Sequence, residues 1–143
     1  IKLIAEAGHS YEDLGCYTTD LGDYPDVARK VAERVARGEF EHGILVCSTG
    51  IGMSIVANKM PGVRAALCHN VQTACRARNH NDANVLCLGA DTIDESTASD
   101  IVRAYLTSHF EGGRHAHRVE KIQALETELT GSAGTDKMGP SAS

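Results

Sequence analysis

The stretch Gly43-Ile44-Leu45-Val46-Cys47-Ser48-Thr49-Gly50-Ile51-Gly52-Met53-Ser54 contains the strongest local pattern in the chain. The apolar run 43–47 predicts a buried strand, and residues 55–59 predict a helix after a glycine-rich turn. A helix N-terminus and the amides of such a turn can hold an anion. They also favour the thiolate form of a cysteine placed there, which here is Cys47.

The spacing of the glycines does not by itself identify a ligand. The turn lacks the Gly-Lys-Ser/Thr ending of a phosphate-binding P-loop and the third glycine of a dinucleotide-binding turn. A cradle for a phosphate or an enolate and an ordinary strand–helix turn both remain open. Cys47 likewise fits either a reactive thiol or a small buried hydrophobic residue.

Composition narrows the class of protein. The chain has 143 residues, a formal net charge of −5 and five cysteines without a Cys-x-x-Cys pair. The negative charge argues against nucleic acid as the main partner. No apolar run approaches the roughly 20 residues of a membrane span, and no signal peptide is visible. We therefore expect a cytoplasmic protein with reduced thiols.

Strand and helix patterns alternate along the chain. Residues 1–8 predict the end of a helix closed by Gly8, and because no start signal precedes it we expect an upstream piece to be missing. We predict strands at 10–14 (weakly), 43–47, 63–68 and 84–89, and helices from Asp23 or Tyr24, at 52–59, 71–78 and 96–107, and after Gly112-Gly113. This order predicts an α/β domain over 1–130 with a mainly parallel sheet covered on both faces. Residues 131–143 predict a disordered tail.

Ligands of parallel sheets bind beyond the carboxyl ends of the strands. The turn 47–52, His69-Asn70 and Asp91 all follow predicted strands, whereas His80 precedes one. We therefore expect His80 to serve the site of another copy. An apolar stripe on the last helix predicts a contact between subunits; it consists of Val119, Ile122, Leu125 and Leu129.

Two further polar groups have both functional and structural interpretations. His80, with Asn81 and Asp82 beside it, is either a general acid or base near neutral pH or part of a solvated turn. Arg114 and Arg118 lie one helical turn apart and either clamp a phosphate or pair with Glu111 and Glu120 on a solvated helix. His115 and His117 do not have the i, i+4 spacing of a helical metal site, so no metal is predicted.

Taken together, the sequence resembles the ribose-5-phosphate isomerase B family over nearly all of its length to about residue 125. The resemblance rests on Asp23-Tyr24-Pro25, Gly43–Ser54, Ala57-Asn58-Lys59, Pro61–Cys68, His80–Leu86 and Phe110–His115. It implies a Rossmann-like three-layer sandwich without its usual first strand, a homodimer that can pair into a tetramer, sites at the subunit interface, and isomerisation of phosphorylated sugars without metal or cofactor.

The resemblance also implies roles for individual residues. Cys47 would be the base that moves a proton between C1 and C2 of ribose 5-phosphate, through an enediolate, to give ribulose 5-phosphate. The amides of Ser48, Gly50 and Gly52 would hold the enediolate oxygens, and Thr49 would relay protons between them. His80 would open the furanose ring with Asn81 beside it, and Arg114 and Arg118 would bind the phosphate.

The chain departs from the family pattern at four places. Ser48 replaces a glycine, and Met53 stands where another branch has a glutamate base. Asp91 stands where many members have a phosphate-facing arginine, and the family's first strand with its Asp-His pair would precede Ile1. The alternatives are therefore an isomerase of another sugar phosphate, of the allose or galactose 6-phosphate type, and a non-catalytic phosphosugar-binding domain.

Overall fold

A parallel three-stranded sheet forms the centre of the molecule. The structure is a computed structural model and describes residues 2–14 and 24–131. The strands β1 (Gly43–Cys47), β3 (Val85–Gly89) and β2 (Ala65–Leu67) lie in the order β1-β3-β2. In the register, Gly43 pairs with Val85 and Cys47 with Gly89, so β1 and β3 begin and end together. The predicted α/β class with a parallel sheet is confirmed.

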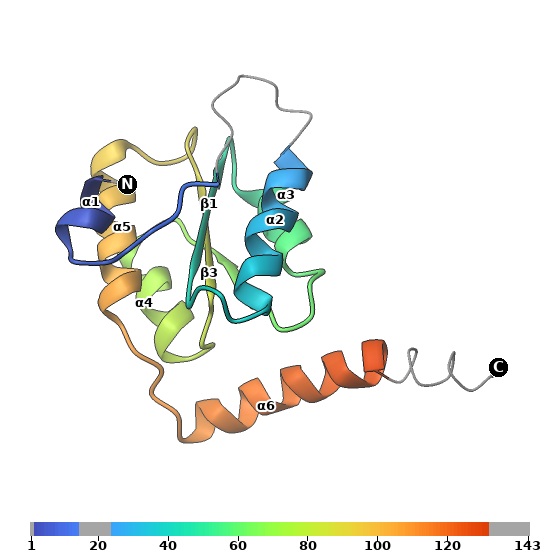
Figure 1. Ribbon diagram of the computed structural model, residues 1–143. Coiled ribbons are helices and arrows are strands. Elements are labelled where there is room, and N and C mark those ends of the chain that lie inside the picture. Colours follow the sequence, from blue (N-terminus) through green and yellow to red (C-terminus); the bar gives the residue numbers. More distant parts are fainter. Residues whose placement is uncertain (1, 15–23, 132–143) are drawn as a thin grey trace.

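Helices cover both faces of this sheet (Figure 1). On one face lie α2 (Tyr24–Ala36) and α3 (Ile51–Ala57), which contact each other and β1. On the other face α4 (Val71–Asn79) packs against α5 (Glu95–Thr107), with the short α1 (Lys2–Glu6) beside them. The three layers of the predicted sandwich are therefore present.

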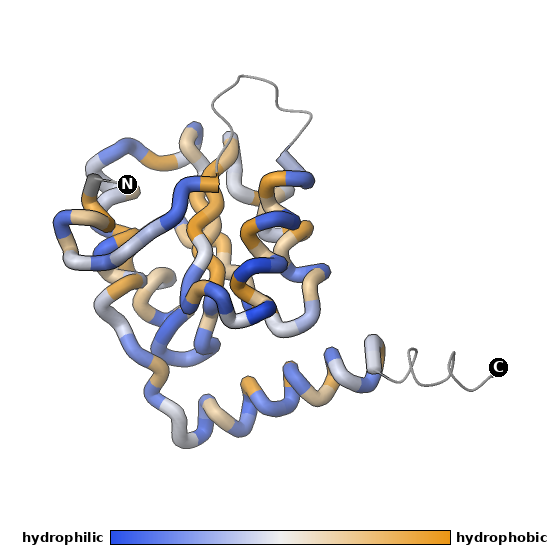
Figure 2. The backbone as a smooth tube through the Cα atoms, viewed as in Figure 1, coloured by the Kyte–Doolittle hydropathy of each residue, from blue (hydrophilic) through white to orange (hydrophobic). Residues whose placement is uncertain are grey.

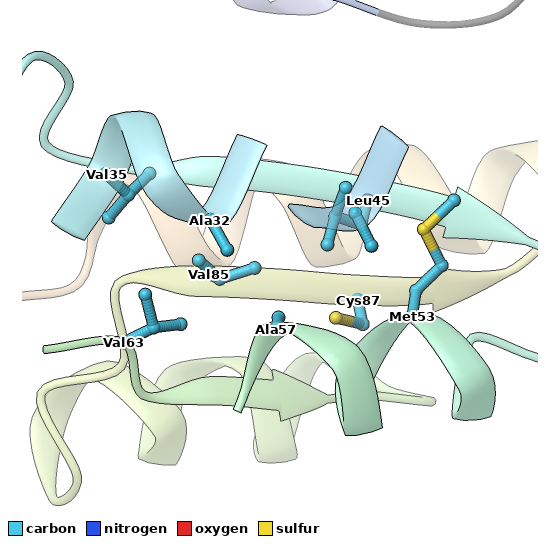
Figure 3. Packing of buried hydrophobic residues seen from close by; sticks show 9 residues of the cluster. Ala32, Val35, Leu45, Met53, Ala57, Val63, Val85 and Cys87 are labelled. Carbon is cyan, nitrogen blue, oxygen red and sulfur yellow. The ribbon is translucent and has the colours of Figure 1, made fainter. Parts of the chain in front are cut away.

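Small side chains let the layers approach closely. Figure 3 shows the face toward α2 and α3, where Ala32 and Ala57 lie against Val85 and Cys87 of the central strand. Apolar residues gather on the strands and on the helix faces turned toward them (Figure 2). A methyl group added to Gly43 would lie 2.8 Å from Val31 Cγ1, so α2 packs directly on the backbone of β1. Burial of these aliphatic side chains supplies the main stabilisation of the sheet.

A hydrogen-bonded tyrosine lies in the core between the sheet and the helices α4 and α5. Tyr105 of α5 is fully buried, and its hydroxyl donates to the carbonyl oxygen of Ala83 at 2.9 Å. His42 Nδ1 lies 3.0 Å from the same hydroxyl, and the His42 ring meets the Tyr105 ring edge to face. Burial lowers the pKa of His42, followed by the charge of Arg78, so the neutral ring is favoured in this contact. The network ties α5 to the segment that leads into β3.

The last helix lies apart from the two layers. α6 (Arg114–Glu126) runs along the edge of the sheet where the strands begin, and continues into a π-helical turn, η2 (Thr127–Gly131). Glu126 Oε1 accepts a hydrogen bond from Gly62 N at 2.8 Å, which ties its end to the loop between α3 and β2. Within the apolar stripe Val119 is buried, while Ile122, Leu125 and Leu129 are about half exposed or more.

Several sequence predictions are corrected at their boundaries. Residues 10–14 form no strand, because Glu12 and Asp13 in this short segment leave it few apolar side chains to bury, and Glu12 instead pairs with Arg34. The strand predicted over 63–68 is limited to β2, and the stripe residue Leu129 lies in the π turn rather than in the α-helix. Gly131 is in that turn. The rest of the predicted tail lies outside the described residues, and so do Asp23 and the loop that precedes it.

None of the helices in the described parts of the chain is long and apolar enough to cross a membrane.

Removing the Tyr105 hydroxyl should destabilise the fold. Tyr105→Phe leaves a buried carbonyl oxygen and the His42 ring without their partner, which costs about 1–3 kcal/mol of unfolding free energy. Urea denaturation measures the loss. Tyr11→Phe, at a tyrosine that is 48% exposed, is the control and should change stability by less than about 0.5 kcal/mol. Equal stabilities for the two variants would contradict the network.

Candidate active site

Cys47 is the last residue of β1 and lies half-buried at the carboxyl end of the sheet. Its sulfur accepts a hydrogen bond from Gly50 N at 3.2 Å. The side chain also lines a cavity of about 1100 Å³ that follows β1 and reaches Tyr24 and Met53. The thiol therefore has an amide donor on one side and an open cavity on the other.

The amides around Cys47 are available to an anion. Gly50 begins α3 as its N-cap residue, and its N–H group points at the cysteine sulfur. The N–H groups of Ser48 and Gly52 have no hydrogen-bond partner among the residues that the structure describes. Unpaired amides at a helix N-terminus attract negative charge. Of the three amides predicted to hold the enediolate, that of Gly50 already donates to the sulfur, while those of Ser48 and Gly52 lie on either side of it in the same turn.

Thr49 is exposed at the tip of the turn. Its hydroxyl oxygen accepts a hydrogen bond from Ile51 N at 3.3 Å, so the side chain lies across the first turn of α3. The hydroxyl hydrogen remains free to interact with a ligand over the same amides.

Backbone contacts with the end of β3 hold this turn in place. Ala90 N donates to the carbonyl oxygen of Cys47 at 2.8 Å, and Asp91 N donates to that of Ser48 at 2.9 Å. A methyl group on Gly89 would lie 2.6 Å from the carbonyl carbon of Thr49, and one on Gly50 would lie 2.5 Å from Leu67 Cδ1. Asp91, predicted at the carboxyl end of the sheet, is therefore a neighbour of the turn and is exposed.

Tyr24 is a site residue that the sequence reasoning missed. Its ring covers Gly52, where a methyl group would lie 2.5 Å from the hydroxyl oxygen. The residue begins α2, with Pro25 in the first turn as predicted. The available signal was the proline, which fixes the start of the helix and therefore the position of the tyrosine before it. Met53 behind it is buried and offers no proton acceptor.

A second group of predicted residues gathers at the opposite edge of the sheet. His80 follows α4 as its C-cap residue and is about one-third exposed, with Asn81 exposed beside it. Arg114 and Arg118 project from the start of α6, and neither guanidinium forms an ion pair within the described chain. The predicted pairing of these arginines with Glu111 and Glu120 is therefore not observed.

An aspartate holds the turn that carries His80. Asp82 has a positive φ of 49°, and its carboxylate pairs with Arg78 Nη1 at 2.9 Å and Arg64 Nη2 at 3.4 Å. The Arg64 guanidinium also donates from Nε to the carbonyl oxygen of Asp82 at 2.8 Å. Two arginines from separate elements thus fix this turn, a role that the local sequence pattern did not predict. Asn70 likewise proves to be a helix cap, since its side chain accepts from Thr73 N.

Three possible metal ligands lie together, but their arrangement does not suit an ion. His80, Glu111 and His115 bring one ligand atom each within 4.8 Å of the others. The two imidazole rings are stacked at 4.0 Å between centroids and 9° between planes. Because a ring nitrogen binds a metal within its ring plane, two parallel rings cannot share one ion without turning.

The two groups cannot meet within one chain. Cys47 lies level with the last residue of β3, whereas His80 precedes the first residue of the same strand. A five-residue strand is about 13 Å long at roughly 3.3 Å per residue. Figure 1 shows the end of α4 and the start of α6 at the edge opposite the turn after β1. The two groups of predicted residues, called below the first and second half-sites, therefore lie at different ends of the sheet.

The sequence is similar to known isomerases of phosphorylated sugars. The sequence matches the ribose/galactose isomerase family over residues 1–122. It is 45% identical over 123 residues to ribose-5-phosphate isomerase B of Escherichia coli, covering 86% of this chain and 83% of that protein. It is 52% identical over 125 residues to D-erythrulose-4-phosphate isomerase of Pectobacterium atrosepticum, covering 87% and 80%.

A solved structure is similar in fold as well as in sequence. Ribose-5-phosphate isomerase B of Mycoplasma genitalium, with bound ribulose 5-phosphate, superposes with a TM-score of 0.84 at 41% identity, covering 89% of this chain and 85% of that one.

A side chain at Gly50 should disrupt the turn. Gly50→Ala combines a left-handed backbone with a clash against Leu67, whereas Gly38→Ala has a similar φ of 78° and nothing within 4 Å of the added carbon. We expect Gly38→Ala to cost about 1–2 kcal/mol and Gly50→Ala about 1–3 kcal/mol more. Chemical denaturation of both variants measures the difference. Equal losses would show that the turn has room for a side chain.

Proposed function

The chain belongs to the ribose/galactose isomerase family and is a sugar-phosphate isomerase, and we propose that it interconverts D-ribose 5-phosphate and D-ribulose 5-phosphate. The observation that carries the proposal is the Cys47 sulfur, which lines a cavity and lies within hydrogen-bond distance of the Gly50 amide. Family relatives named for this reaction support the choice of substrate.

The chemistry follows from the first half-site. With the sugar in its open form, the Cys47 thiolate removes the proton on C2, and the electrons form an enediolate whose charge rests on the oxygens of C1 and C2. In this mechanism the amides of Ser48, Gly50 and Gly52 bind that charge. Removing one such preorganised donor typically costs about 3–4 kcal/mol of transition-state stabilisation. Thr49 moves a proton between the two oxygens, and Cys47 returns its proton to C1.

The second half-site supplies the remaining groups from another copy of the chain. His80 and Asn81 act on the cyclic sugar to open it, and Arg114 and Arg118 bind the phosphate. Because the two half-sites lie at opposite edges of the sheet, a homodimer in which the copies run antiparallel completes two sites. The exposed apolar side chains of α6 support such a contact.

A four-carbon substrate is the second candidate. The relative with 52% identity is named for D-erythrulose 4-phosphate. A direct kinetic comparison of the five-carbon and four-carbon sugar phosphates separates the two candidates. The other outcomes of the same assay are activity on a six-carbon sugar phosphate and no activity on any of these sugars, which would indicate a purely binding role.

We place the enzyme in the cytoplasm, where free thiols such as the four described here persist.

Replacing the cysteine should abolish turnover without unfolding the protein. Cys47→Ala removes the base, and we expect kcat to fall by about 10²–10⁴-fold, the usual contribution of general acid–base catalysis. The control is Cys75→Ala, at a half-buried free thiol on α4, which should retain activity. Coupled assays and circular dichroism measure both variants. Full activity of Cys47→Ala would remove this residue from catalysis.

Mixing two inactive variants tests the shared site. Cys47→Ala and Arg114→Ala damage different half-sites, and each should be nearly inactive alone at low substrate. After joint unfolding and refolding, about half of the dimers contain one of each, with one intact site of two. We therefore expect recovery of about a quarter of the wild-type activity. No recovery, with dimers demonstrated by light scattering, would place the whole site within one chain.

A further inference from the structure

We infer that His80, Glu111 and His115 act as a unit that carries a single proton. In this unit the buried, neutral ring of His115 supports the ring of His80, and Glu111 keeps the proton on His80. The inference rests on the proposed function, in which His80 opens the sugar ring. It assigns positioning roles to Glu111 and His115, two residues outside the predicted set of site residues.

The stacked rings differ in their surroundings. His115 is only 8% exposed and sits in the first turn of α6, where its N–H group donates to the carbonyl oxygen of Gly112. His80 ends α4 on the surface, and its ring lies parallel to that of His115 with centroids 4.0 Å apart. A buried ring stacked face to face fixes the plane of the exposed one. His115 therefore limits the directions in which His80 can present its nitrogens.

Glu111 reaches both rings from the segment before α6. Its Oε1 lies 3.9 Å from His80 Nε2 and 3.8 Å from His115 Nε2. The backbone N–H of Glu111 donates to the carbonyl oxygen of Asn79 at 3.0 Å, next to His80 in the chain. The carboxylate is thus anchored beside the pair at a distance that favours one positive charge between them.

The charges around the pair allow only one proton. Burial lowers the pKa of His115, and the charges of His80, Arg114 and Arg118 lower it further, whereas Glu111 alone raises it. These groups come from α4, from α6 and from the segment between α5 and α6, which are the elements that meet at the pair. A proton on His115 would face three positive neighbours. A proton on the buried ring of His115 is therefore disfavoured.

This arrangement leaves one nitrogen of His80 for the substrate. Nε2 faces Glu111, and no hydrogen bond occupies Nδ1 within the described residues. In ring opening, Nδ1–H gives its proton to the furanose oxygen O4 as the C1–O4 bond breaks. The C1 hydroxyl releases a proton to water, and C1 becomes the aldehyde carbon. His80 then regains a proton from water, and Glu111 stabilises the cation again.

Two substrates separate ring opening from proton transfer. D-ribose 5-phosphate is mostly cyclic, whereas D-erythrose 4-phosphate cannot form a furanose because its terminal oxygen carries the phosphate. Cys47 acts on both, so the ratio of the two kcat/KM values reports on ring opening alone. The ratio is measured at pH 5.5 and pH 8 for the wild type, Glu111→Gln, His115→Phe, His115→Ala and the control His117→Ala, an exposed histidine on the same helix.

Each variant has a distinct expected result. Glu111→Gln should lower the ratio about tenfold at pH 8, where protons are scarce, and leave it unchanged at pH 5.5, where they are abundant. His115→Phe keeps an aromatic ring stacked on His80, and the ratio should stay within about threefold of the wild-type ratio. His115→Ala removes that ring and should lower the ratio about tenfold at both pH values. His117→Ala should match the wild type. A Glu111→Gln ratio equal to wild type at pH 8, or equally reduced at both pH values, would overturn the inference.

A second measurement does not depend on activity or on any variant folding. Nitrogen-15 spectra of the wild-type imidazoles should show His115 titrating at a lower pH than an unperturbed histidine. A His115 that titrates at or above the ordinary histidine range would overturn the inference. Failure of the wild type to isomerise either sugar would instead refute the proposed function, and these spectra would still decide the state of the pair.

Discussion

The geometry of the candidate site depends on close contact between two backbone segments. The turn after β1 lies so near the end of β3 that neither Gly50 nor Gly89 has room for a methyl group. The contact is held by two hydrogen bonds, from Ala90 to Cys47 and from Asp91 to Ser48. The left-handed conformation of Gly50 then turns its amide toward the sulfur. A larger residue at either position would move the amides away from the thiol.

The sequence was sufficient for the order of the layers because the apolar pattern of each element is local. β1 was predicted with its observed bounds, and β3 within one residue, since a buried central strand needs an unbroken apolar run. The weak strand at 10–14 failed because the short segment carries two acidic side chains. The local pattern of apolar and polar residues does not reveal whether a neighbouring strand is present to pair with such a segment.

The residues of the site were harder to predict where they act through distant partners. Tyr24 and Gly52 meet only after α2 and α3 pack together, and Asp82 gains its importance from Arg64, which lies eighteen positions away. The cysteine and the glycines, by contrast, lie within one turn, so their proximity to each other could be predicted from the sequence. Placement of Cys47 as base and of Arg114 and Arg118 at the phosphate remains a prediction supported by exposure and position.

The start of α6 connects phosphate binding to ring opening in physical terms. Arg114 and His115 are consecutive, so one points to solvent while the other is buried under His80. Arg118 lies one turn further on the exposed side. In the proposed site, a phosphate bound by both guanidiniums would fix the helix that carries His115, and its negative charge would favour a positive charge on the imidazole pair. Bound substrate would thus help to keep the ring-opening acid protonated, which couples phosphate binding to ring opening through the start of α6.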